Sequence, residues 1–123
     1  MLPDEPTFTP ATLYERRLKE LGNLQPGWLD GEGEPVAGAV IETVRTVIQA
    51  LLDDETVCGY PLLFPTVDGG LQAAWIDGTT TFDVFVTPAL TFEVCRYDTV
   101  HDVYTETSVT AAADVVEVFR RGR

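Results

Sequence analysis

Apolar residues recur at steps of three or four positions in the first half of the chain and at every second position in much of the second half. The first spacing is typical of an amphipathic helix, and the second is typical of a strand with one buried face. The change of period follows Gly59. We therefore expect helices before this point and a sheet after it.

The clearest helical pattern starts at Pro35 and runs to about Asp53. Its apolar positions form one wide stripe, which comprises Val36, Val40, Ile41, Val44, Val47, Ile48, Leu51 and Leu52. A stripe of this width predicts that the helix packs against a sheet. A shorter helix is expected after Thr9-Pro10, a capping residue followed by a proline suited to the first helical position, and a left-handed residue at Gly22-Asn23 should end it.

The second half predicts short strands over residues 61–67, 71–76, 79–87, 90–97 and, with the weakest pattern, 100–105. Short turns at Asp68-Gly69-Gly70, Asp77-Gly78 and Pro88-Ala89 separate the first four, and such turns join antiparallel neighbours. A last helix is expected over residues 111–119, capped by Ser108 or Thr110.

This order predicts an α+β fold in two layers. An antiparallel meander of four to five strands should pack against the long N-terminal helix, with a helix at the C-terminus. Proline-rich residues 1–8 are expected to form a flexible arm, and residues 9–123 a single domain.

The alternation along the strands assigns side chains to the two faces of the sheet. Facing the long helix, we expect Phe82, Val84, Leu90, Phe92 and Val94. The opposite face is polar except for Ile76, Phe85, Tyr97 and Tyr104. The first or last helix is expected to cover these exceptions. The alternative is that they form an interface.

The net charge of −12 restricts the partners of the protein. It argues against nonspecific binding to nucleic acid or to an anionic membrane, because both would be repelled. The acidity is either an adaptation to a salt-rich or GC-rich source or an acidic surface that docks on a basic protein. No apolar run reaches the length of a membrane span and no signal peptide is visible, so a cytoplasmic location is expected.

Reactive residues are few, and none forms a recognised constellation. His101 is the single histidine, and neither Ser108 nor Cys95 lies in a nucleophile motif with it. Cys58 and Cys95 are expected to be small buried side chains rather than a disulfide. Asp30, Glu32 and Glu34 alternate like calcium ligands, but an EF-hand would need glycine and glutamate where Pro35 and Ile41 stand. No metal or cofactor is expected.

The loop Gly27–Gly33 places Trp28 among glycines and acids. The indole is expected to anchor the loop to the core, and the alternative is an exposed contact in an acidic rim. The candidate binding residues are Trp28, Asp30, Glu32, Asp68, Trp75 and Phe85.

Two motifs resemble those of small, largely uncharacterised bacterial and phage proteins that carry a Trp-Asp-Gly-x-Gly loop and a Pro-Thr-x-Asp-Gly-Gly hairpin. The loop corresponds to residues 28–33, with Leu29 inserted between tryptophan and aspartate, and the hairpin corresponds to residues 65–70, ahead of the strand that contains Trp75. The resemblance implies an α+β fold and a mobile-element or stress-related setting, and no activity.

The sequence favours a non-enzymatic acidic domain of the antitoxin, immunity or inhibitor type, which acts on a protein with a basic site. The alternative is an oligomerising structural or accessory module, possible as a homodimer, with Ile76 and Phe85 buried between copies. A small hydrolase is the least favoured hypothesis.

Overall fold

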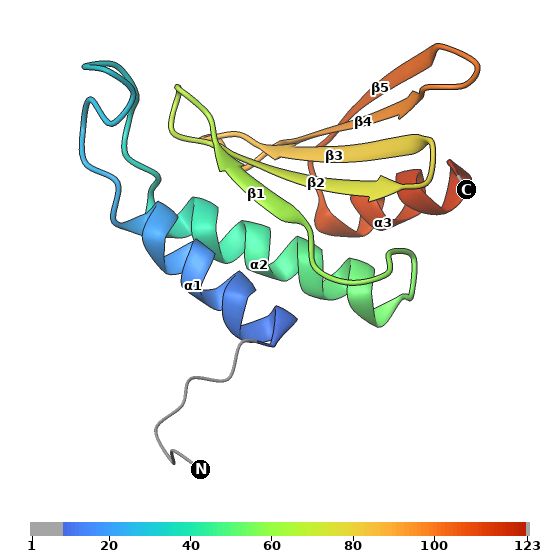
Figure 1. The fold of residues 1–123 in the computed structure, drawn as a ribbon, viewed down its shortest axis with the longest axis horizontal. Coiled ribbons are helices and arrows are strands. Elements are labelled where there is room, and N and C mark those ends of the chain that lie inside the picture. The colour runs from blue at the N-terminus through green and yellow to red at the C-terminus, as the bar shows by residue number, and fades with distance from the viewer. Residues whose placement is uncertain (1–8, 123) are drawn as a thin grey trace.

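The structure, a computed structural model, describes residues 9–122. The elements in chain order are α1 (Pro10–Gly22), α2 (Gly38–Asp53), β1 (Leu62–Pro65), β2 (Leu71–Asp77), β3 (Thr80–Val86), β4 (Phe92–Asp98), β5 (Val103–Val109) and α3 (Ala112–Arg121). This arrangement, drawn in Figure 1, confirms the predicted α+β fold with a helix at each end. The predicted arm at residues 1–8 lies outside the described residues.

The five strands form one antiparallel sheet in the order β1-β2-β3-β4-β5, which is the predicted meander with all five strands. Its central register places Ala73 opposite Val84 and Val84 opposite Val94. The β1–β2 turn depends on glycine, since a Cβ at Gly70 would lie 2.4 Å from the carbonyl oxygen of Val86 and Gly69 has a φ of +93°. Any larger residue at Gly70 would therefore displace the start of β2.

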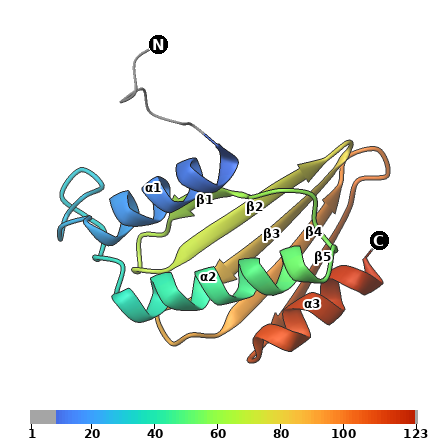
Figure 2. The same cartoon turned by 90° about the horizontal axis from the view of Figure 1, so that it is seen from below.

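All three helices cover the same face of the sheet (Figures 1 and 2). The buried strand residues on this face are Leu63, Leu71, Ala73, Trp75, Phe82, Val84, Val86, Phe92 and Val94. They share one apolar cluster with Leu18 of α1, Leu51 of α2 and Phe119 of α3. The predicted contact between the apolar face of the sheet and the long helix is confirmed.

The expectation that the first or last helix covers the opposite face is wrong. α1 and α3 lie in the same layer as α2, and Ile76 on the opposite face remains 70% exposed. The physical reason is the distribution of charge on the sheet. The opposite face carries Asp83, Glu93 and Glu106, and burying these acids under an apolar helix would be costly.

Several predicted element boundaries are wrong: β1 ends at Pro65 rather than at residue 67, and β5 ends at Val109 rather than at residue 105. At two further boundaries, local hydrogen bonds hold nearby residues outside the element. α2 begins at Gly38 rather than at Pro35, since the Glu34 amide donates to the Val67 carbonyl at 2.9 Å and ties the chain to the β1–β2 turn. β5 begins at Val103 rather than at residue 100, because Asp98 accepts hydrogen bonds from the amides of Val100 and His101 and closes a turn there.

Three further local predictions are wrong. Leu90 lies in the β3–β4 turn with a φ of +64° and is exposed, since its amide donates to the Thr87 carbonyl. α3 follows Ala111 without a side-chain cap, so neither Ser108 nor Thr110 caps it. Asn23 ends α1 with a φ of −99°, outside the left-handed region, whereas Thr9 caps the start of α1 as predicted.

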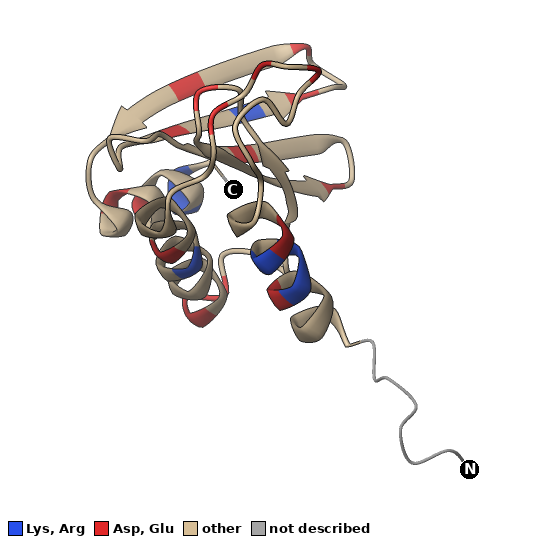
Figure 3. Cartoon of the chain, turned by 90° about the vertical axis from the view of Figure 1, so that its left-hand side faces the viewer, with Lys and Arg blue, Asp and Glu red and all other residues tan. Residues whose placement is uncertain are grey.

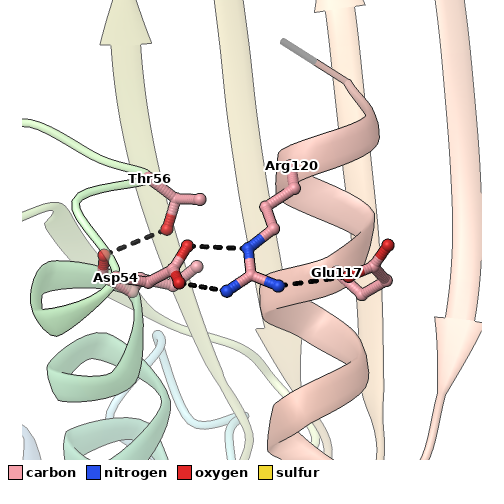
Figure 4. Close-up of polar contacts among 5 residues, drawn as sticks. Asp54, Thr56, Glu117 and Arg120 are labelled. Carbon is pink, nitrogen blue, oxygen red and sulfur yellow. Dashed lines mark hydrogen bonds and ion pairs between the residues drawn. The ribbon is translucent and has the colours of Figure 1, made fainter.

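An ion pair links the end of α2 to α3 (Figure 4). The Arg120 guanidinium donates to both carboxylate oxygens of Asp54, the C-cap residue directly after α2. Glu117 accepts a third hydrogen bond from Arg120 at 3.4 Å. Beside this pair, the buried hydroxyl of Thr56 donates to the carbonyl of Leu51 at 3.0 Å. The Asp54–Arg120 contact holds the two helices side by side on the sheet, and the Thr56–Leu51 bond fixes the turn that follows α2.

The Asp54–Arg120 pair should make stability depend on pH. The hydrogen bond from Arg120 lowers the pKa of Asp54 from its ordinary value of 3.8. The stabilisation is therefore complete above 3.8 and is lost as the pH falls through the lowered pKa. Arg120→Ala should have a lower melting temperature than the wild type at neutral pH, and this difference should shrink at about pH 2. Thermal denaturation followed by circular dichroism measures it.

Arg121→Ala is the matched control, because among residues 9–122 the one acid that Arg121 pairs with is Glu117, at 3.9 Å. It removes the same charge from the same helix. A melting-temperature loss for Arg121→Ala as large as that for Arg120→Ala would contradict a specific role for Asp54.

Candidate functional site

Charge is divided unequally between the helices and the rest of the protein. Within residues 9–122 the helices carry six acids, Glu15, Glu20, Glu42, Asp53, Asp114 and Glu117, and six basic residues, Arg16, Arg17, Lys19, Arg45, Arg120 and Arg121. The strands and connections carry twelve acids: Asp30, Glu32, Glu34, Asp54, Glu55, Asp68, Asp77, Asp83, Glu93, Asp98, Asp102 and Glu106. Their one basic residue is Arg96. Figure 3 shows this division in colour.

Several helical charges neutralise one another across short distances. Arg45 of α2 donates to Glu15 of α1, and Arg17 lies 3.4 Å from Glu20 within α1. The remaining base, Arg96, turns toward the helices, where its guanidinium lies 5.9 Å from the centre of the Phe82 ring. The net negative charge of the described residues is therefore concentrated on the sheet and the loops.

The side of the sheet away from the helices, called the open face below, is made of three rows of cross-strand neighbours. The first row is Ile76, Thr81, Tyr97 and Tyr104. The second is Leu62, Ala74, Asp83, Cys95 and Glu106. The third is Phe64, Gln72, Phe85, Glu93 and Ser108.

The open face combines exposed apolar side chains with unneutralised acids. Leu62, Phe64, Ile76 and Tyr104 are exposed. Within the described residues no basic side chain belongs to this face, and its acids Asp83, Glu93 and Glu106 form no ion pair. Sequence reasoning missed Leu62 and Phe64, although their alternation with buried Leu63 is the signal that assigns them to this face.

Trp28 is half-buried and packs within its own loop rather than in the core. Its indole nitrogen donates to the carbonyl of Glu34 at 2.7 Å, and a Cβ on Gly33 would lie 2.6 Å from the ring. The Leu29 amide donates to the Glu32 carbonyl, and this bond holds the two sides of the loop together. The prediction that Trp28 anchors the loop to the core is therefore wrong, because the indole contacts residues of its own loop instead.

Two predicted motifs meet at one end of the sheet. The loop of residues 27–34 joins the β1–β2 turn through the Glu34–Val67 hydrogen bond, and a Cβ on Gly69 would lie 3.0 Å from the carbonyl oxygen of Pro35. We call residues 27–34 and 66–70 the acidic end. It contains Asp30, Glu32 and Asp68, and its apolar residues Leu29 and Val67 are exposed.

The other two candidate residues lie on opposite faces of the sheet. Trp75 is 7% exposed, packs edge-on against Phe119 with ring centres 5.5 Å apart, and donates to the Gly59 carbonyl. It therefore belongs to the core. Phe85 is half-buried on the open face, between Gln72 and Glu93. Of the six candidates, only Trp75 has no place on the open face or the acidic end.

The groups considered for catalysis have other partners. The hydroxyl of Tyr104 donates to the Cys95 sulfur at 3.2 Å, and burial raises the pKa of this thiol, which keeps it neutral. His101 pairs with Asp98 at 2.9 Å, and this contact lowers the pKa of Asp98. Both cysteines are free, but Cys58 is exposed, so only Cys95 fits the predicted burial.

The described residues contain no group of three or more histidine, cysteine, aspartate or glutamate residues placed to hold a metal ion. No helix in this part of the chain has the length and apolarity needed to cross a membrane.

The closed loop depends on the contact between Gly33 and Trp28. Gly33→Ala should move the indole away from the Glu34 carbonyl, because the added methyl group overlaps the ring. The exchange of the indole proton with water should then accelerate at least about tenfold. Proton nuclear magnetic resonance of the Trp28 indole group measures this rate.

Gly31→Ala is the control for backbone strain. Gly31 also has a positive φ, +92°, but a Cβ there would meet nothing within 4 Å. Equal acceleration in the two variants would show that backbone conformation, rather than the indole contact, keeps the loop closed.

Comparison with known proteins gives no match to a family model, to a curated protein or to a solved structure. The resemblance of the two motifs to small bacterial and phage proteins stays a prediction.

Proposed function

We propose that the protein is a non-enzymatic, acidic protein-interaction domain of the antitoxin, immunity or inhibitor type. It binds a protein with a basic site through the open face and the acidic end. The observation that carries this proposal is the charge division within residues 9–122, in which the helices are balanced while the sheet and the loops hold twelve acids and one base.

The chemistry of the open face supports a protein partner. Ile76, Phe64 and Tyr104 supply apolar and aromatic contact area, which association buries. Asp83, Glu93 and Glu106 lie among these side chains, in the second and third rows, and carry negative charge that a basic partner would neutralise. Complementary charge also accelerates association and rejects acidic partners. The same field disfavours nucleic acid and anionic membrane.

The alternative function is self-association through the same face, and the exposed Ile76 and Leu62 favour it. Two copies that met there would bring their acids together without a basic residue between them, so repulsion opposes this pairing. Light scattering at high protein concentration discriminates between the two functions. We also propose a cytoplasmic location, in which the two free cysteines would stay reduced.

The proposed surface can be tested with two variants of equal charge. One carries Asp83→Asn, Glu93→Gln and Glu106→Gln on the open face, and the control carries Glu20→Gln, Glu42→Gln and Asp114→Asn on the helices. A protein captured in stoichiometric amount from the source cells is titrated against each variant by calorimetry. The open-face variant should bind at least about tenfold more weakly at low salt, because it loses complementary charge at the contact.

The control should bind within about twofold of the wild type, because its substitutions lie away from the proposed contact. Failure to recover a stoichiometric partner, or equal weakening by both variants, would contradict binding through the open face. A partner with an acidic surface would also contradict it.

A further inference from the structure

The two edges of the sheet differ in how their backbone groups are protected. β1 has four residues, and Pro65 has no amide hydrogen to offer a further strand. The Arg17 guanidinium donates to the outward carbonyl of Leu63 from Nε at 3.1 Å and from Nη2 at 3.0 Å. Proline, a short strand and a covering side chain are devices that prevent edge pairing. The β1 edge is therefore closed to another strand.

The β5 edge has none of these devices. β5 spans Val103–Val109, contains no proline or lysine, and pairs with β4 in continuous register without a bulge. Six of its seven residues are exposed. Its sequence, VYTETSV, is rich in β-branched and aromatic residues that favour extended backbone.

The register of the sheet identifies which β5 backbone groups point outward. The Thr87 amide donates to the Thr91 carbonyl, and the Thr99 amide donates to the Thr79 carbonyl. These two bonds show that the odd-numbered residues of β4 bond to β3. Residues of β4 that bond to β3 alternate with those that bond to β5. The inward-bonding β5 residues are then 103, 105, 107 and 109. This leaves the backbone groups of Tyr104, Glu106 and Ser108 free at the edge.

We propose that the β5 edge accepts an extended, basic segment of the partner as a sixth strand. The inference rests on the proposed function and adds the mode of binding to it. Each added strand residue that faces β5 can exchange hydrogen bonds with an outward backbone group. Glu106 stands in the middle of this edge and places a negative charge on the open face where the added strand would lie.

A second copy of this chain fits the edge poorly. The two-fold antiparallel register that pairs all seven β5 residues would place Glu106 opposite its own counterpart. Like charges directly opposite each other in a sheet are destabilising. Each copy also carries a net charge of −12. A partner strand with lysine or arginine opposite Glu106 replaces this repulsion with attraction.

The preferred segment should alternate in character. Its basic residues would lie on the open face beside Tyr104 and Glu106, and its β-branched residues would lie on the other side, beside Thr105 and Thr107. A capped peptide of alternating lysine and valine, about eight residues long, meets both requirements. The same peptide with glutamate in place of lysine is the charge control, and a fully N-methylated lysine peptide is the backbone control.

Hydrogen exchange on the full chain tests the proposal. In the free protein the amides of Tyr104, Glu106 and Ser108 should exchange quickly, while those of Thr105 and Thr107 are protected by β4. The lysine peptide should slow the first three amides at least about tenfold. The glutamate peptide and the N-methylated peptide should leave them unchanged, because one is repelled and the other lacks amide donors.

Substitutions at Glu106 separate charge from backbone pairing. Glu106→Gln keeps the outward amide and should weaken binding of the lysine peptide by about threefold to tenfold at low salt. Glu106→Pro also removes the amide hydrogen, and it should bind the lysine peptide at least about tenfold more weakly than Glu106→Gln does. Protection of Thr105 and Thr107 in Glu106→Pro shows that β5 stays paired with β4. If that protection is lost, the substitution has disrupted the sheet, and the test of backbone pairing is then the comparison of the lysine peptide with the N-methylated peptide on the wild-type protein.

The outcomes distinguish this inference from the proposed function. Salt-sensitive binding of the lysine peptide without protection of Tyr104, Glu106 and Ser108 would overturn strand addition and leave a basic partner in place. Binding of the lysine peptide no tighter than the glutamate peptide would overturn both. Protection of the three amides in the protein alone, at concentrations where it dimerises, would replace the basic partner with a second copy.

Discussion

The packing of three helices on one face of the sheet is the constraint on which the rest of the structure depends. Leu51, Val84 and Phe119 belong to one buried cluster that α2 shares with the sheet and α3. Each such side chain stabilises the fold by about 2 kcal/mol when removed from water. Because all the helices contribute to this cluster, none is left to cover the opposite face, where apolar side chains remain beside acids.

The division of charge follows the same two layers. The helices balance acids against bases and use pairs such as Arg45–Glu15 and Arg120–Asp54 to join neighbouring elements. Within residues 9–122 the sheet and loops carry one base, Arg96, which is turned toward Phe82, and Asp54 is the acid of a connection that pairs with a helical arginine. The acids of the open face, Asp83, Glu93 and Glu106, have no such compensation. Uncompensated charge on a folded surface opposes compactness, and a basic partner would relieve that repulsion. The edge at β5 gives such a partner backbone groups as well as charge.

The core face of the sheet and the helices that cover it could be predicted from local patterns. The alternation that buries Phe82, Val84, Phe92 and Val94 and the stripe along α2 were sufficient, since a side chain's face follows directly from the period of its element. The boundaries were less predictable. Hydrogen bonds such as Glu34–Val67 join residues distant in the chain and hold segments out of the elements that their composition favours.

The sequence by itself determined the α+β class, the meander, the strand faces and the excess of acid, because these follow from periodicity, turn residues and composition. Only the tertiary structure decided that Trp28 closes its own loop, that Trp75 is core and that the face bearing Phe85 stays open. It also decided that β1 is capped by Arg17 while β5 has a free edge. These outcomes depend on which elements pack together, and no local pattern encodes that choice because identical amphipathic stripes can cover either side of a sheet.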